Sequence, residues 1–89
     1  MLRGNFDEVL RDKFKEWSLT AAERDVTLLI IRGLSVADIA AARNTAQGTI
    51  KAQSTSIFRK IGVGFKTELM SVIIDEFLDT SYHDGLSAQ

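Results

Sequence analysis

The 89-residue sequence contains no cysteine, no proline and only one histidine, His83. The lack of cysteine excludes disulfides and thiolate metal sites, and no cluster has metal-ligand spacing, so we expect no metal and no cofactor. No apolar run approaches the ~20 residues of a membrane span, and residues 1–10 lack the apolar core of a signal peptide, so a cytoplasmic protein is expected. The absence of proline and of alternating β-branched residues predicts one small all-α domain.

Helical periodicity is strong at both ends of the chain. Residues 5–17 predict an amphipathic helix whose apolar side chains share one side: Phe6, Val9, Leu10, Phe14 and Trp17. Residues 20–32 predict a second helix, opened by a capping box of Thr20 and Glu23 and ended by Gly33. Residues 67–78 predict a last apolar helix, and residues 79–89 a polar, disordered tail.

The middle of the chain predicts a short helix, a tight turn and a longer helix. Ser35 is expected to cap the short helix, residues 43–45 to form the turn, and Gly62 to end the long helix of about residues 47–61. The expected buried stripe of the long helix is Ile50, Ser54, Ile57, Phe58 and Ile61. The opposite face is polar and carries no acid, and a helix with two such faces suits a DNA major groove.

Charge is distributed unevenly although the net charge is only −1. Between Asp38 and Glu68 there is no acid, and the basic residues there are Arg43, Lys51, Arg59, Lys60 and Lys66. From Glu68 onward the chain has acids but no Lys or Arg. A basic middle segment is typical of DNA binding, although charge alone leaves a simply solvated helix face as an equal alternative.

Several short motifs resemble, in order and spacing, the LuxR-type (GerE-like) DNA-binding domain. They are Leu19-Thr20, Glu23-Arg24, Gly33-Leu34-Ser35, Asp38-Ile39-Ala40, Gly48-Thr49-Ile50-Lys51, Ile57-Phe58-Arg59-Lys60-Ile61-Gly62-Val63 and Lys66-Thr67-Glu68-Leu69. The resemblance covers residues 17–78 and implies a tetrahelical helix-turn-helix bundle that binds DNA, usually as a homodimer through its last helix. The predicted division is therefore an additional N-terminal helix (1–18), the helix-turn-helix domain (19–78) and a tail (79–89).

The resemblance also implies which residues contact DNA. Lys51, Ala52 and Thr55 match the positions that reach base edges, and Gln53 can pair with adenine if it points outward. The expected phosphate contacts are Gln47, Thr49, Arg59, Lys60 and Lys66. Gly48, inside the first turn of the recognition helix, suggests a close approach either to the preceding helix or to phosphate.

Two positions depart from the family pattern. Ala46 stands where a capping Ser is common, so the recognition helix is expected to be capped by Thr45 or to fray. Phe65 and Lys66 stand where Asn-Arg or Ser-Arg is usual. Lys66 then replaces the Arg without its bidentate geometry, and Phe65 is expected to plug the core.

The terminal helices leave two alternatives open. In the last helix Leu69, Val72, Ile73 and Phe77 can face the core, but the apolar arc is wide enough for a dimer interface of Met70, Ile73, Ile74 and Phe77. Burial of this helix under the N-terminal helix competes with that interface. The N-terminal helix packs either on its own domain or, through Phe6, Leu10, Phe14 and Trp17, against a second copy, an upstream domain or a partner protein.

The sequence thus favours a homodimeric, sequence-specific transcription regulator that binds duplex DNA. No nucleophile–base pair, paired carboxylates or Walker-type loop is present, so we predict that it is not an enzyme and has no catalytic residue. The alternative is a protein-interaction module of the same fold that modulates a transcription regulator through its terminal helices without binding DNA. No receiver or ligand-binding domain is recognisable, so either a partner or the abundance of the protein controls it, or the chain is a fragment of a longer protein.

Overall fold

The structure is a computed structural model that describes the backbone of residues 2–87 and the side chains of residues 6–79. Within that range the chain forms helices and no strands: α1 (Leu2–Glu16), α2 (Ala21–Ile31), α3 (Val36–Ala42), α4 (Gln47–Ile61) and α5 (Lys66–Ser87). The all-α prediction is confirmed, and His83 lies outside the described side chains.

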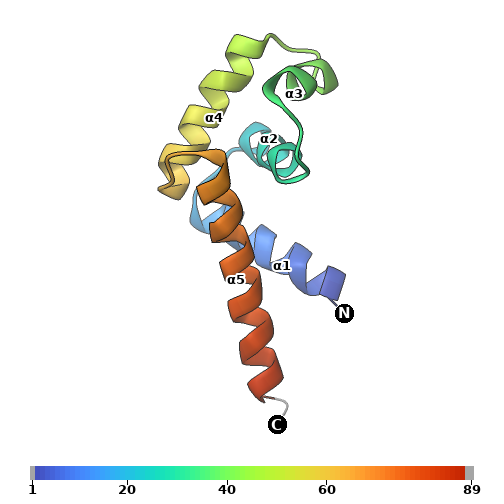
Figure 1. Cartoon of the computed structure of the whole chain (residues 1–89), viewed down its shortest axis with the longest axis vertical. Coiled ribbons are helices and arrows are strands. Elements are labelled where there is room, and N and C mark those ends of the chain that lie inside the picture. Colours follow the sequence, from blue (N-terminus) through green and yellow to red (C-terminus); the bar gives the residue numbers. More distant parts are fainter. Residues whose placement is uncertain (1, 88–89) are drawn as a thin grey trace.

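The helices form two groups along one elongated body of 50 × 23 × 21 Å. Helices α2, α3 and α4 pack together at one end, while α5 leaves that group from its first turn and runs away from it (Figure 1). Helix α1 packs along α5. One hydrophobic core joins both groups, and its fully buried apolar side chains are Val26, Ile39, Ile50, Ile57 and Leu69.

The predicted helix caps are present. Thr20 and Glu23 form the capping box of α2, and the Ser35 hydroxyl accepts a hydrogen bond from the Asp38 amide at the start of α3. Gly33 and Gly62 follow α2 and α4 with φ of 92° and 88°, a left-handed conformation that costs glycine little. Asn44 has φ 54° and makes the tight turn between α3 and α4.

Helix α1 packs on its own domain. Leu10 and Phe14 are each only 5% exposed and belong to the core, and the rings of Phe6 and Phe77 meet edge to face at 5.1 Å. Lys13 of α1 also pairs with Glu76 of α5 at 3.2 Å. The prediction that Leu10 and Phe14 reach a partner is therefore wrong, because α5 and α2 already bury them.

Three other predictions about the chain need correction. The last helix does not end at residue 78 but continues to Ser87, since no proline occurs and no glycine interrupts it before Gly85, so the disordered tail is wrong for residues 79–87. The first helix starts at Leu2 rather than at residue 5. Phe65 is 58% exposed and does not plug the core, because the loop before α5 turns it away from the helices. The division at residues 18 and 78 stays a prediction.

Candidate nucleic-acid interface

Helix α4 presents one bare polar face to solvent. Its buried side packs on α2 and α3 through Ile50 and Ile57, both fully buried. The exposed residues of the outer face are Gln47, Gly48, Thr49, Lys51, Ala52, Thr55 and Arg59. This face contains no acid, so it combines positive charge with short side chains that let another surface come close.

The N-terminus of α4 has no side-chain cap. The N-cap residue Ala46 makes no side-chain hydrogen bond, and Thr45 does not take over that role. Only the Ala46 carbonyl serves this end, accepting from the amides of Thr49 and Ile50 at 3.1 and 3.3 Å. The helix nevertheless begins at Gln47, so it does not fray. Its first amides are left for water or an anion.

Gly48 lies beside these amides and touches nothing. A Cβ atom built on it would meet no atom within 4 Å. Close approach of the preceding helix is therefore excluded as the reason for this glycine. Of the two explanations that the sequence offered, only approach by an external group such as phosphate remains.

The structure separates two of the predicted contact residues from this face. Gln53 is half-buried, and its Oε1 is buried without a hydrogen-bond partner in the described part of the chain. Lys60 points toward α2, where its ammonium is held in an internal ion pair. A third basic residue, Arg43, also pairs internally, with Asp25 of α2 at 3.3 Å. These side chains tie the helix-turn-helix to α2 instead of extending from it.

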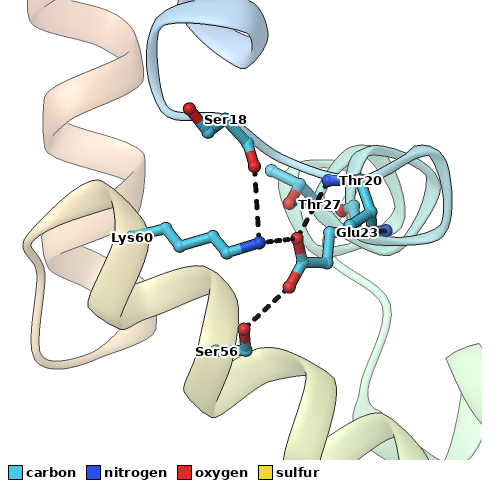
Figure 2. A network of polar contacts seen from close by, with 6 residues as sticks. All are labelled: Ser18, Thr20, Glu23, Thr27, Ser56 and Lys60. Carbon is cyan, nitrogen blue, oxygen red and sulfur yellow. Dashed lines mark hydrogen bonds and ion pairs between the residues drawn. The ribbon is translucent and has the colours of Figure 1, made fainter.

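The ion pair of Lys60 belongs to a network centred on Glu23 (Figure 2). The Lys60 ammonium donates to Glu23 Oε1 at 2.6 Å and to the Ser18 carbonyl at 3.3 Å. The same Oε1 accepts from the Thr20 amide at 2.9 Å, and Oε2 accepts from the Ser56 hydroxyl at 2.7 Å. Glu23 therefore connects the start of α2 with two successive turns of α4.

Burial and charge make this carboxylate energetically important. Glu23 is 7% exposed. The Lys60 ammonium, followed by the Thr20 amide, lowers the pKa of Glu23 to about 2, against the opposing effect of burial. A buried carboxylate with three donors stays ionised at neutral pH and fixes the angle between α2 and α4. The network sets the orientation in which α4 presents its outer face.

Sequence reasoning found only half of this network. The capping box of Thr20 and Glu23 follows from a local motif, whereas Ser56 and Lys60 lie far along the chain and were assigned to the polar face of α4. The available signal was their position: both lie where the polar face meets the buried stripe, beside Gln53. A polar residue at such an edge can turn inward when a partner waits there.

The exposed face of α5 differs from the predicted dimer interface. Ile73 is 3% exposed and belongs to the core, and Phe77 packs on Phe6, because α1 covers this side of α5. Met70 is half-buried. By contrast Ile74 and Leu78 are 50% and 56% exposed, so the apolar surface left on α5 is one turn of helix around these two residues.

Fold and site together define a helix-turn-helix protein: α3 and α4 form the motif, α2 supports it, and the outer face of α4 is open. A family model described as bacterial regulatory proteins, luxR family, matches residues 17–73, which is more than half of the chain. The chain belongs to this family, whose helix-turn-helix domains are DNA-binding modules of transcription regulators and not enzymes. No curated protein and no solved structure is detectably similar to the chain. Among the described residues, no helix is long and apolar enough to cross a bilayer.

Proposed function

We propose that the protein is a sequence-specific transcription regulator that binds duplex DNA as a homodimer, with α4 of each copy in a major groove. The observation that carries this proposal is the outer face of α4, which is exposed, free of acid and lined by small or basic side chains. An α-helix fills the major groove of B-DNA, where each base pair presents a distinct pattern of donors, acceptors and methyl groups. Membership of the family supports the same role.

Three side chains on this face are proposed to read bases. Lys51 can donate to the O6 and N7 of guanine, and Ala52 can contact a thymine methyl. The Thr55 hydroxyl donates to the Lys51 carbonyl at 3.1 Å, so Thr55 offers its methyl group rather than its hydroxyl to a base. Gln53 would join them only by rotating its buried amide outward.

Phosphates are proposed to bind at both ends of α4. Gln47 and Thr49 lie beside the uncapped amides, Arg59 lies near the other end of the helix, and Lys66 opens α5 nearby. All of these side chains are exposed. Lys60 leaves the proposed set, since releasing it for a phosphate would leave the buried Glu23 carboxylate without its cation.

The homodimer is proposed to form through Ile74 and Leu78 of α5, with Met70 at the edge. Two exposed apolar side chains on consecutive turns of one helix are a suitable centre for a two-fold contact. The same surface favours the second candidate, a protein-interaction module that does not bind DNA. In that case α5 binds a different protein, and the outer face of α4 is only a solvated surface.

Selection of binding sites from a pool of random duplexes tests the proposal. We expect an enriched site with two similar half-sites, and each substituted base pair in it should weaken binding by about 5- to 150-fold, the equivalent of about 1–3 kcal/mol. Thr55→Val, which keeps the methyl group, should select the same site, whereas Lys51→Ala should lose preference at one position of each half-site. A pool that shows no enrichment would contradict sequence-specific binding.

A further inference from the structure

The exposed face of α5 has a heptad seam. Thr67, Ser71, Ile74 and Leu78 are exposed and follow one another at spacings of four, three and four residues. This spacing is that of the alternating seam positions through which two helices pack over a long distance. The half of the seam near α4 is small and polar, and the far half is apolar.

The two edges of this seam are chemically different. Met70 and Phe77 lie along one edge, beside α1, and both are half-buried. Glu68 and Asp75 lie along the other edge, and both are exposed. After Lys66 the helix has no Lys or Arg that could neutralise the acidic edge.

Two-fold symmetry turns this difference into a choice of direction. In an antiparallel pair of helices, like edges meet, so the two acidic edges would face each other across the contact. In a parallel pair, each edge meets the unlike edge of the other helix. Only the parallel pair then sets Asp75 against Met70 of the second copy, and it avoids juxtaposing carboxylates, which repel one another.

The position of the DNA-binding unit favours the same direction. Helices α2, α3 and α4 lie at the N-terminal end of α5, and α5 runs away from them (Figure 1). An antiparallel contact around Ile74 and Leu78 would send the two α4 helices to opposite ends of the dimer. A parallel contact keeps both at one end, where they can face the same duplex.

We propose that two copies of the chain pair through parallel α5 helices, with Ile74 and Leu78 each facing its own counterpart and the acidic edges outside. This inference rests on the proposed homodimer and adds its direction. The dimer axis then runs along α5, and the half of α5 farthest from α4 holds the two recognition helices as a pair above the DNA.

Single-cysteine variants test this directly, because the natural chain has no cysteine. Ile74→Cys, Leu78→Cys and Asp75→Cys are each oxidised mildly, with and without duplex DNA, and the covalent dimer is measured on a non-reducing gel. All three positions are exposed, so the fold tolerates the changes, and circular dichroism verifies this. Sedimentation equilibrium of the unmodified chain, with and without the duplex, gives its oligomeric state separately.

The parallel pair predicts that Ile74→Cys and Leu78→Cys both crosslink and that Asp75→Cys crosslinks at least tenfold more slowly. An antiparallel pair allows at most one of the first two: if the two copies meet at position 74, their positions 78 lie about 12 Å apart along the axis, beyond the ~7 Å reach of a disulfide. Crosslinking of only one of the two, or fastest crosslinking through position 75, would overturn the parallel direction but leave the dimer. A monomer in sedimentation with and without DNA, and no crosslink, would overturn the dimer itself.

Discussion

Replacing Glu23 with Gln should make the stability of the domain lose much of its dependence on acid. The substitution keeps an acceptor for the Thr20 amide but removes the charge that pairs with Lys60. The pKa of Glu23 falls from 4.5 to about 2 in the folded protein. At ~1.4 kcal/mol per pKa unit this corresponds to about 3 kcal/mol of stability at neutral pH, and since the Lys60 side chain is 30% exposed, we expect about 2–3 kcal/mol.

The sign of the effect defines the pH window. Because the folded pKa lies below the unfolded one, the contribution is complete above the unfolded value of 4.5 and is lost as the pH falls toward 2. Urea unfolding followed by circular dichroism at a series of pH values measures it. The free energies of unfolding of the natural chain and Glu23→Gln should differ by about 2–3 kcal/mol at pH 7 and converge near pH 2.

Glu8→Gln is the matched control. Glu8 is exposed on α1, so its substitution should change the free energy of unfolding by less than about 0.5 kcal/mol at any pH. A difference for Glu23→Gln that stays constant between pH 7 and pH 2 would refute the reasoning, since it would arise from shape or hydrogen bonding and not from ionisation. A difference no larger than that of Glu8→Gln would do the same.

Three further substitutions test particular placements. Gly48→Ala should leave the free energy of unfolding unchanged or raise it by up to ~1 kcal/mol in urea titrations, because the added Cβ meets nothing, yet weaken duplex binding several-fold in anisotropy titrations; unchanged affinity would remove Gly48 from the DNA interface. Phe14→Ala should cost about 3–5 kcal/mol in urea unfolding, since Phe14 is buried under α5, and a loss below ~1 kcal/mol would contradict packing of α1 on its own domain. Phe65→Ser should cost less than ~1 kcal/mol in the same assay, and a core-sized loss would contradict its exposure.

Features that depend on neighbours in sequence were predictable. The capping box of Thr20, the hydroxyl cap of Ser35 and the helix stops at Gly33 and Gly62 follow from local backbone chemistry, and the structure confirms them. The buried positions Ile50 and Ile57 likewise follow from the helical period. Membership of the helix-turn-helix family follows from the set of motifs and is confirmed.

Features that depend on how two distant segments meet were not predictable. A wide apolar arc on α5 does not say which part is covered, and only the position of α1 decides that Ile73 is buried while Ile74 is exposed. Lys60 resembles any basic residue on a DNA-facing helix until α2 brings Glu23 within 2.6 Å. Both failures concern amphipathic edges, where a side chain follows whichever neighbour supplies the better contact.

The central claim, that the outer face of α4 binds duplex DNA, is tested most directly by fluorescence anisotropy of a labelled duplex across a salt series. The proteins compared are the natural chain, Lys51→Ala and Lys15→Ala, the last removing an equal charge from the exposed surface of α1. If Arg59 and Lys66 of two copies neutralise four phosphates, log K should fall against log salt with a slope of roughly −3 to −4. Lys51→Ala should bind at least tenfold more weakly and Lys15→Ala almost normally. Absence of binding at low salt, or equal losses in the two variants, would contradict the claim.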